Sequence, residues 1–286
     1  MEDIIKKAGV LIEALPYIKK FYDKTIVIKY GGAAMTDRTI RRAVLEDIVF
    51  MNYVGMQPVL VHGGGPFISK RIEELGREVK FVKGFRVTDE ETMHVVENEL
   101  MKINSDIVSE ITALGGSALS LSGKEDRLIE VKKHPAIDGE DLGYVGEITK
   151  INADVIQKMV ASDIIPVIAP IGIGEDEHAY NINADQVSAE VAGSLGALKL
   201  VVLTNVKGIL KKLDDPSSLV QHASAAEVKE LIASKIIGSG MIPKVNACVR
   251  ALEHGVKKTH IVDVNIPHPL LLEIFTDTGI GTEIVA

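Results

Sequence analysis

The segment TIVIKYGG at residues 25–32 and the segment PVLVHGGGP at residues 58–66 decide the fold class. Each begins as an apolar run containing β-branched residues, which favours a strand, and each run stops at a group of glycines. Apolar residues recur at helical spacing over residues 37–54, and a second helix is expected over residues 67–75. The order strand, helix, strand, helix predicts parallel neighbouring strands in an α/β fold.

The same alternation continues along the chain and extends the predicted sheet. Further apolar strands are expected over residues 117–123, 164–172, 199–206 and 258–264. Further helices are expected over residues 90–114, 153–161, 184–193, 225–234 and 244–253, and short hairpins between residues 127 and 149. Because the strands are apolar along their whole length, we expect helices on both faces of a mostly parallel sheet that two lobes share.

The first 23 residues predict an amphipathic helix that precedes the sheet. Leu11, Leu15 and Ile18 recur at spacings of three and four, and Pro16 is expected to bend or interrupt the helix. Since the first strand begins near residue 25, the apolar face of this helix must be buried elsewhere. It packs either on its own subunit or on a neighbouring one.

The composition argues against several classes of protein. The 286 residues include 32 Lys and Arg against 40 Asp and Glu, and a net charge of −8 disfavours binding to nucleic acid or to an anionic membrane. Aromatic residues make up 4% with no Trp, too few for a platform that stacks bases. The single Cys248 forms no internal disulfide, and no apolar run reaches the ~18 residues of a membrane span. We expect a soluble, cytoplasmic protein.

The glycine clusters Gly31-Gly32 and Gly63-Gly64-Gly65 fall between strands and helices, where parallel sheets bind ligands. Glycine lets backbone N–H groups approach an anion, and a helix N-terminus favours negative charge, so a phosphate cradle is the functional interpretation. The alternative is a pair of tight turns. Neither cluster matches the phosphate loop G-x-x-x-x-G-K-[ST] or the dinucleotide fingerprint G-x-G-x-x-G, which disfavours a nicotinamide-dependent enzyme.

Four ionisable residues are candidates for chemistry near these glycines. Lys29 lies in an otherwise apolar strand, where its charge needs a partner unless the side chain reaches the surface. Lys244 follows GSGMIP at the start of a predicted helix. Asp185 also lies at a helix start, where capping the helix is an alternative role. His62 fits either a catalytic group or a hydrogen-bonded structural histidine.

Seven segments together resemble the amino acid kinase family over almost the whole chain. They are KYGGAAM (29–35), LVHGGGP (60–66), GFRVTDEETM (84–93), YNINADQVSAEVAGSLGA (180–197), LTNVKGIL (203–210), GSGMIPKV (238–245) and FTDTGIGTEI (275–284). The glycine clusters alone fit several branches of this family. GFRVTD together with NINAD distinguishes the branch that phosphorylates N-acetyl-L-glutamate.

The resemblance implies an open three-layer αβα sandwich and ATP-dependent phosphorylation of the side-chain carboxylate of N-acetyl-L-glutamate, a step of arginine biosynthesis. Residues 24–195 would bind the acyl-glutamate and dimerise, and residues 196–286 would bind the nucleotide. Mg²⁺ would be held by the phosphates of ATP and not by the protein. A carboxylate acceptor is already ionised at neutral pH, so the transfer needs no general base.

The resemblance also implies roles for the matching residues. Lys29 would stabilise the transferring phosphoryl group and Lys244 the departing β–γ bridge, while Asp185 would hold both ammonium groups. Arg86 would bind the α-carboxylate of the acceptor, unless it is a surface arginine in a turn. The phosphates would meet Gly31, Gly32, Gly63 and Gly64. The acyl-glutamate would also meet Gly64, Gly65, Asn181 and Asn183. The nucleotide would meet Thr204, Asn205, Val206, Gly208, Leu210 and Lys244. Asn205 stands where the family usually has Asp.

In this family, a helix like that predicted for residues 1–23 is associated with arginine-sensitive hexamers, in which such helices interlace three dimers. The C-terminal segment also resembles that branch, which implies feedback inhibition by L-arginine. The inhibitor would lie near Lys211, His260, Glu273 and Gly281. VNIPHP (264–269) replaces the more usual Gly-Arg-containing loop.

Two other functions stay open on the sequence alone. Another carboxylate or carbamate kinase of the family would share the glycine loops. A non-catalytic amino-acid sensor would share the fold, but it would be expected to lose Lys29, Asp185 or Lys244, and all three are present.

Overall fold

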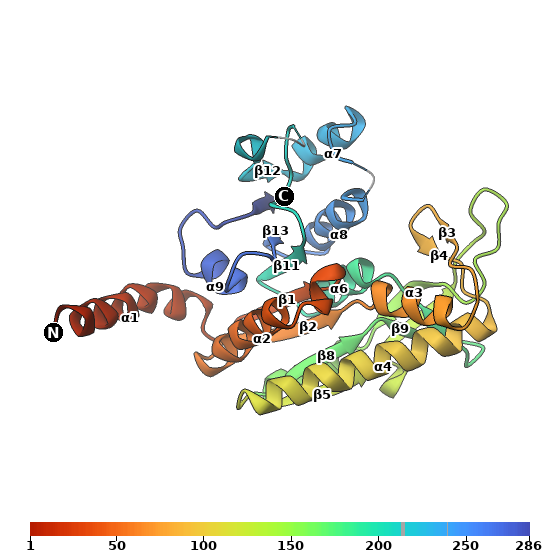
Figure 1. Ribbon diagram of the computed structural model, residues 1–286, viewed down its shortest axis with the longest axis horizontal. Helices are drawn as coiled ribbons and strands as arrows, with labels where there is room; N and C mark the ends of the chain where they lie inside the picture. The colour runs from red at the N-terminus through yellow and green to blue at the C-terminus, as the bar shows by residue number, and fades with distance from the viewer. Residues whose placement is uncertain (213–214, 239) are drawn as a thin grey trace.

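The strands β1 (Thr25–Tyr30) and β2 (Gln57–His62) lie side by side in the centre of the computed structural model, which describes residues 1–212, 215–238 and 240–286. They run parallel, and Tyr30 lies opposite His62. Both strands therefore end at the same level, and the two glycine clusters follow directly at their carboxyl ends. Figure 1 shows the two strands side by side.

Within the described residues, six more strands extend this pair into an eight-stranded sheet. From edge to edge the order is β12 (His222–Ser224), β14 (Thr282–Val285), β13 (Lys258–Asp263), β11 (Lys199–Thr204), β1, β2, β8 (Ile165–Ala169) and β5 (Ala118–Ser122). Neighbouring strands are parallel except for β13 and β14, which run antiparallel. The predicted open, mostly parallel sheet is confirmed.

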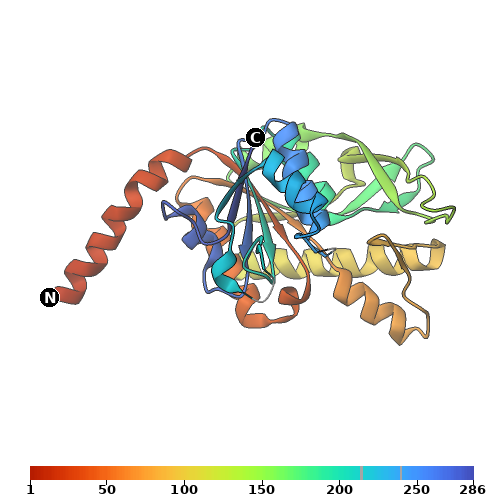
Figure 2. The ribbon, with the colours of Figure 1, turned by 90° about the horizontal axis from the view of Figure 1, so that it is seen from above.

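Helices cover both faces of the sheet because its strands are apolar on both faces. Val27 and Leu200 point into one core, whereas Ile26 and Ile28 point into the other, following the two-residue period of a strand. The first core lies under α5 (Ala153–Val160), α6 (Ala184–Ser194), α7 (Ala225–Ala233) and α8 (Ile242–Glu253). The second lies under α2 (Arg38–Tyr53), α4 (Glu90–Ala113) and α9 (Pro269–Ile274). Figure 2 shows α8 and α4 on opposite sides of the strands.

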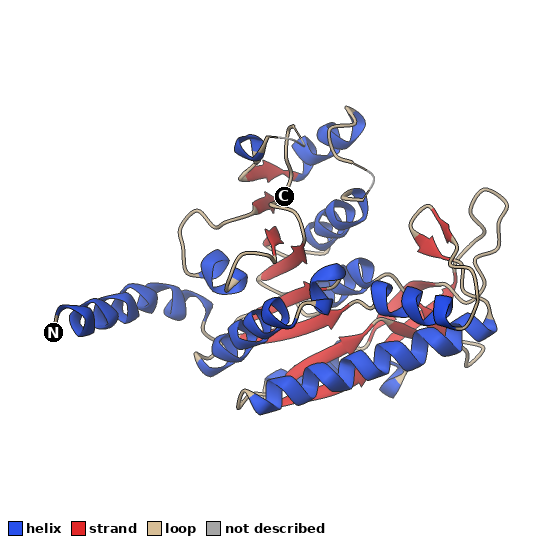
Figure 3. Ribbon diagram, viewed as in Figure 1, coloured by secondary structure: helices blue, strands red, loops and turns tan. Residues whose placement is uncertain are grey.

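A smaller sheet contains the strand that directly follows β8 in the chain. Its strand order is β10 (Ala179–Asn181), β9 (Ile171–Gly174), β6 (Ile129–Lys133) and β7 (Gly146–Ile151). The antiparallel pair β6 and β7 lies where hairpins were expected. A separate hairpin of β3 (Phe81–Val82) and β4 (Phe85–Arg86) projects beside α3 (Gly65–Glu74), as Figure 3 shows. Short 3₁₀ helices span Ala33–Thr36, Glu125–Arg127 and Pro216–Ser218.

Some predicted boundaries differ from the structure. Pro16 was expected to bend or interrupt the first helix, and the helix α1 (Glu2–Phe21) continues through it without interruption. Pro16 is exposed, and a backbone carbonyl that loses its helical partner there can bond to water instead. The sequence pattern does not predict α9 or β14, because both are short and follow a run of turn residues.

The helix α1 extends away from the rest of the chain (Figures 1 and 2). The side chains of Ile5, Leu11 and Ile12 are 63%, 69% and 69% exposed, respectively. The end of the helix is anchored, because Phe21 is buried in the second core and the Tyr17 hydroxyl donates a hydrogen bond to Asp277 at 2.7 Å. No helix of the described residues has both the length and the apolar character of a membrane span.

Candidate active site

Two cavities open beside the ends of β1 and β2, and they meet at Lys29. The larger has a volume of about 580 Å³ and the smaller about 220 Å³. Lys29 and Gly32 line both cavities. Two compartments that share a lysine suit a transfer between two bound molecules.

Lys29, Asp185 and Lys244 form a charged cluster at this junction. The Lys29 Nζ atom lies 2.9 Å from Asp185 Oδ1, and the Lys244 Nζ atom lies 3.7 Å from Asp185 Oδ2. The Lys29 and Asp185 side chains are only 8% and 7% exposed, so Lys29 does not reach the surface. Burial by itself raises the pKa of the Asp185 carboxyl, but the charges of the two lysines outweigh it and hold the pKa below its ordinary value. The cluster therefore carries a net positive charge, which suits a phosphate.

The start of α6 explains why Asp185 is available to the lysines. The Asn183 side-chain oxygen accepts a hydrogen bond from the Asp185 N–H at 2.8 Å, so Asn183 caps the helix. Asp185 is therefore not the helix cap, and its alternative role is excluded. Asn183 also lines the smaller cavity, but its side-chain oxygen already accepts the capping hydrogen bond from the Asp185 N–H.

The glycine clusters allow the two chain segments to approach each other closely. A Cβ atom at Gly31 would lie 3.1 Å from Lys29 Nζ and 3.4 Å from the Cα atom of Gly63. A Cβ atom at Gly64 would lie 2.7 Å from Leu100 Cδ2. Gly32 has a φ of +87°, in the left-handed region that favours glycine. Gly32 therefore fits a tight turn, and Gly31 and Gly64 allow the two chain segments to approach each other closely.

Arg86 is buried in the wall of the smaller cavity, with neutral partners. Its Nη2 atom donates to the Gly65 carbonyl at 3.1 Å and to the Ser69 hydroxyl at 2.8 Å. Its Nη1 atom is buried and has no hydrogen-bond partner among the described residues. The guanidinium also stacks over Phe81 at 4.7 Å from the ring centre. Burial lowers the pKa of Arg86, but an arginine stays charged at neutral pH. An unpaired buried cation in a cavity favours an anionic ligand.

Asn181 is held in the same wall by a residue that the sequence did not single out. The Asn181 Nδ2 atom donates to Thr88 Oγ1 at 3.2 Å, and the Thr88 hydroxyl donates to the Arg86 carbonyl at 2.7 Å. Thr88 therefore links Asn181 to the strand that carries Arg86. The only signal for it was its place in the segment GFRVTD.

Every residue that was expected to bind the nucleotide lines the larger cavity. They are Thr204, Asn205, Val206, Gly208, Leu210 and Lys244. Apolar residues that were not singled out complete the lining, namely Ile209, Ile236, Ile237 and Met241. A largely apolar compartment that is also lined by two lysines suits a molecule with a flat, weakly polar part and a polyanionic part.

His62 is fully buried and lines neither cavity. Its Nδ1 atom lies 2.9 Å from the Gly63 carbonyl oxygen, and its Nε2 atom lies 3.2 Å from the side-chain nitrogen of Asn104. Burial lowers the pKa of His62 to about 4. His62 is therefore a hydrogen-bonded structural histidine that a substrate in either cavity does not reach.

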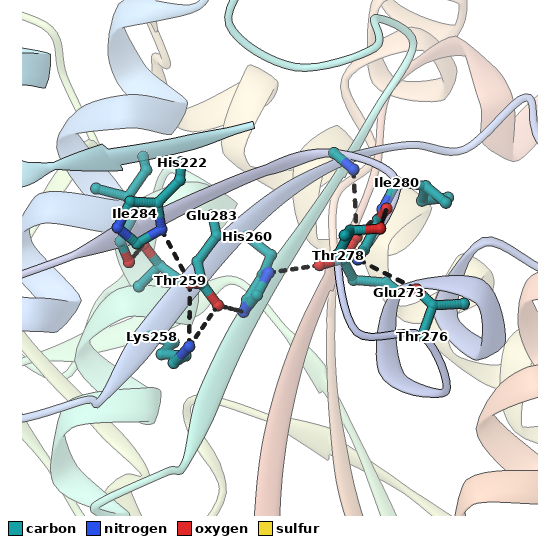
Figure 4. Close-up of polar contacts among 12 residues, drawn as sticks. His222, Lys258, Thr259, His260, Glu273, Thr276, Thr278, Ile280, Glu283 and Ile284 are labelled. Atoms are coloured by element: carbon teal, nitrogen blue, oxygen red, sulfur yellow. Dashed lines mark hydrogen bonds and ion pairs between the residues drawn. The ribbon is translucent and has the colours of Figure 1, made fainter. Parts of the chain in front are cut away.

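A third cavity of about 370 Å³ lies between the end of α1 and the C-terminal strands. Figure 4 shows the His260 ring between two carboxylates: Nδ1 lies 2.6 Å from Glu273 and Nε2 lies 3.6 Å from Glu283. The other Glu273 oxygen accepts backbone N–H groups from Ile280 and Gly281 at 2.8 and 3.3 Å. Burial, only partly offset by the hydrogen bond to Glu273, lowers the pKa of His260. Lys211 and Gly281 do not line this cavity, although the Gly281 N–H donates a hydrogen bond to Glu273.

A model of the amino acid kinase family matches residues 24–263, a stretch that contains both glycine clusters, the charged cluster and Arg86. The chain belongs to the amino acid kinase family. Among its relatives in the family, an acetylglutamate kinase from Moorella thermoacetica is 53% identical, with 98% of both chains covered. An acetylglutamate kinase from Methanobrevibacter smithii is 50% identical, with 98% of this chain and 99% of the relative covered.

This amino acid kinase is also similar to solved structures. N-acetylglutamate synthase from Neisseria gonorrhoeae, complexed with coenzyme A and N-acetyl-glutamate, superposes with a TM-score of 0.88 at 28% identity. The match covers 98% of this chain but only 63% of the synthase chain. A structure of the same synthase complexed with coenzyme A and L-arginine superposes with a TM-score of 0.83 at 27% identity, covering 97% and 65% of the two chains.

Proposed function

We propose that this amino acid kinase is an acetylglutamate kinase. It transfers the γ-phosphoryl group of ATP to the side-chain carboxylate of N-acetyl-L-glutamate, giving N-acetyl-L-glutamyl 5-phosphate and ADP in a step of arginine biosynthesis. Arg86 is the observation that carries this proposal, because it is a buried cation whose Nη1 atom lacks a partner among the described residues. An α-carboxylate in the smaller cavity would satisfy that atom and leave the acceptor chain directed towards Lys29.

The chemistry needs charge compensation more than proton transfer. An oxygen of the ionised acceptor carboxylate attacks the γ-phosphorus, and the bond from phosphorus to the β–γ bridging oxygen breaks. Both partners are anions, so their repulsion is the main barrier. Lys29, which lines both cavities, would neutralise the transferring group, and Lys244 in the larger cavity would neutralise the departing bridge. Asp185 would hold both ammonium groups in place.

Mg²⁺ would accompany ATP in the larger cavity. The donor set there consists of two lysines, amide and hydroxyl groups and backbone N–H groups, which fit phosphate oxygens better than a bare cation. The described residues contain no cluster of three or more His, Cys, Asp or Glu side chains suited to a metal ion. The ion would therefore be bound mainly by phosphate oxygens and water, and it would supply further neutralisation of phosphate charge.

Incubation with ATP, Mg²⁺ and N-acetyl-L-glutamate in hydroxylamine tests the proposal, because hydroxylamine traps an acyl phosphate as a stable hydroxamate. We expect turnover with N-acetyl-L-glutamate and little with aspartate, glutamate, carbamate or UMP. Turnover of one of those acceptors alone would assign a different kinase of the family. Binding of N-acetyl-L-glutamate without any product would assign the amino-acid sensor.

The same proposal includes feedback inhibition by L-arginine in a hexamer built as a trimer of dimers. The third cavity adjoins the end of α1. It is lined by Asp277, Glu273 and Glu283, which suit a guanidinium group, and by Lys20, Lys199, Lys257 and Lys258, which suit a carboxylate. The exposed apolar residues of α1 need a partner, and the corresponding helix of a neighbouring subunit would cover them. Arginine would act by favouring one of two ring conformations, the one in which the active sites are held open.

A further inference from the structure

His62 and Asn104 form a buried pair directly behind the second glycine cluster. His62 is the last residue of β2, and Asn104 lies in the middle of α4. Both residues are 0% exposed, and neither lines one of the two substrate cavities. Any effect of this pair on a bound substrate must therefore pass through the backbone of the glycine loop.

The hydrogen bonds of the pair define one protonation state of the histidine. A carbonyl oxygen only accepts, so the 2.9 Å contact with the Gly63 oxygen places a proton on Nδ1. The Asn104 amide donates one hydrogen to the Val167 carbonyl in β8 at 2.8 Å, and its other hydrogen faces His62 Nε2 at 3.2 Å. The Nε2 atom is thus the acceptor. Burial favours this neutral ring, since it lowers the pKa of His62 to about 4.

This ring fixes the orientation of one peptide group. The Gly63 carbonyl and the Gly64 N–H belong to the same trans peptide, in which the two groups point in opposite directions. The Gly63 N–H is itself bonded to the Tyr30 carbonyl of β1 at 2.8 Å. Glycines on both sides leave such a peptide free to rotate, and the His62 hydrogen bond removes that freedom. The Gly64 N–H is directed away from His62 and has no hydrogen-bond partner among the described residues, while Gly64 itself lines the smaller cavity.

We infer that His62 and Asn104 are positioning residues that hold the Gly64 N–H group ready to bind an oxygen of the transferring phosphoryl group. Asn104 selects the Nδ1-protonated ring, the ring holds the Gly63 carbonyl, and the rigid peptide directs the N–H. This inference rests on the proposed phosphoryl transfer. A donor held in place before the reaction stabilises developing charge without reorganisation during the reaction.

Two substitutions separate the two hydrogen bonds of the ring. The amide of Asn in His62→Asn occupies the position of Nδ1 and retains the donor to Gly63, but it loses the contact with Asn104. The amide of Gln in His62→Gln occupies the position of Nε2 and retains the contact with Asn104, but it loses the donor to Gly63. Each variant gives up one hydrogen bond in the same buried place, so each serves as the stability control of the other.

We expect His62→Gln to lower kcat at least about tenfold, because the Gly64 N–H is no longer held in place. His62→Asn should retain most of the wild-type kcat. The KM values for ATP and for the acceptor should change little in both, since neither side chain touches a substrate. Thermal denaturation of the two variants checks that both are folded. Equal kcat values for the two folded variants would overturn the inference, as would a change confined to KM.

The protonation state gives a readout that does not depend on activity. Nitrogen-15 NMR of the wild-type His62 ring should show a protonated Nδ1 and a bare Nε2 at pH 7, and a proton on Nε2 would overturn the inference even if a variant fails to fold. A wild-type protein that shows the expected ring but does not phosphorylate N-acetyl-L-glutamate would refute the proposed function instead. In that case the Gly64 N–H would still be held, but for a different acceptor.

Discussion

Asp185 offsets the repulsion between the two lysines of the proposed phosphate site. Two ammonium groups that converge on one phosphate repel each other, and they lose solvation when they are buried. The Asp185 oxygens lie 2.9 and 3.7 Å from the Lys29 and Lys244 nitrogens, so one anion offsets part of that repulsion. One positive charge is left over for the ligand, and the side chains that carry it are fixed in position.

Removing either lysine should therefore affect the reaction more than binding. We expect Lys29→Ala and Lys244→Ala each to lower kcat about 10²-fold or more, because each loses charge stabilisation in the transition state. Steady-state kinetics with saturating ATP measure this effect. Lys132→Ala, which removes an exposed lysine outside both cavities, is the control and should behave like the wild type. A wild-type kcat in Lys29→Ala would exclude the role assigned to that residue.

Arg86 should act on acceptor binding. Its contact with a carboxylate is made equally in the ground state and the transition state, so Arg86→Ala should raise the KM for N-acetyl-L-glutamate while kcat changes little. The expected increase is roughly 10- to 100-fold, the range for losing a hydrogen-bonded charge. Because Arg86 lines only the smaller cavity, the KM for ATP is the internal control. A normal KM with a collapsed kcat would show that Arg86 contacts the phosphoryl group instead.

At the scale of elements, the first turn of α6 has its helix cap at Asn183 and the proposed catalytic residue Asp185 two positions later. Asn183 caps the helix, whereas Asp185 pairs with the lysines. We expect Asn183→Ala to lower the free energy of unfolding by about 1 kcal/mol, the usual cost of losing a helix cap. Asp185→Ala should lower kcat strongly in a protein that stays folded. Chemical denaturation and kinetics on both variants test this division, and unfolding of Asp185→Ala would mean that Asp185 is needed for the fold.

The contact between β2 and α4 should make stability depend on pH. The pKa of His62 is about 4 in the folded chain and 6.5 in its ordinary state, so between these values only the unfolded chain binds the proton. The full contribution is present above pH 6.5 and is lost as the pH falls towards 4, up to roughly 3 kcal/mol. Urea denaturation from pH 7 to pH 4 measures it. His62→Asn should lose less stability over this range, and identical pH slopes for the two proteins would contradict the buried neutral ring.

At the scale of the whole molecule, α1 is a helix that extends away from the sheet and leaves large apolar side chains exposed. Leu11 and Ile12 are 69% exposed, whereas Phe21 at the end of the helix is 2% exposed. Phe21 therefore anchors the helix, whereas Ile5, Leu11 and Ile12 present apolar side chains to solvent. Such a surface is typical of a helix that binds another subunit.

Deleting residues 1–15 tests this assembly while leaving Tyr17 and Phe21 in place. We expect the full chain to be a hexamer by light scattering, and the shortened chain to be an active dimer that L-arginine inhibits less. The double substitution Leu11→Lys and Ile12→Lys, which keeps the chain length, should have the same effect on assembly. A full-length dimer, or a shortened chain that is still a hexamer, would refute the role given to α1.

Much of the candidate site could be predicted from local sequence patterns, because many of its residues lie close together along the chain. The two glycine clusters directly follow apolar strands, and the carboxyl ends of neighbouring parallel strands lie at the same end of the sheet. This brings Lys29, Gly31, Gly32, Gly63 and Gly64 together without further information. The residues expected to meet the nucleotide also line one cavity, because most of them follow the neighbouring strand β11. Their predicted roles, the division into lobes and the cytoplasmic location stay predictions.

Short-range periodicity in the sequence was enough to predict a mostly parallel sheet and the lysine and glycine groups that follow its strands. The side chains that come together from distant parts of the chain could be found only from the folded protein. Asn104 reaches His62 from 42 residues away, and Asn183 takes the capping role that leaves Asp185 for the lysines. Lys211 lies outside the cavity that holds His260 and Glu273. The physical reason is that such contacts depend on how whole helices pack on the sheet, and spacing along the chain does not encode that packing.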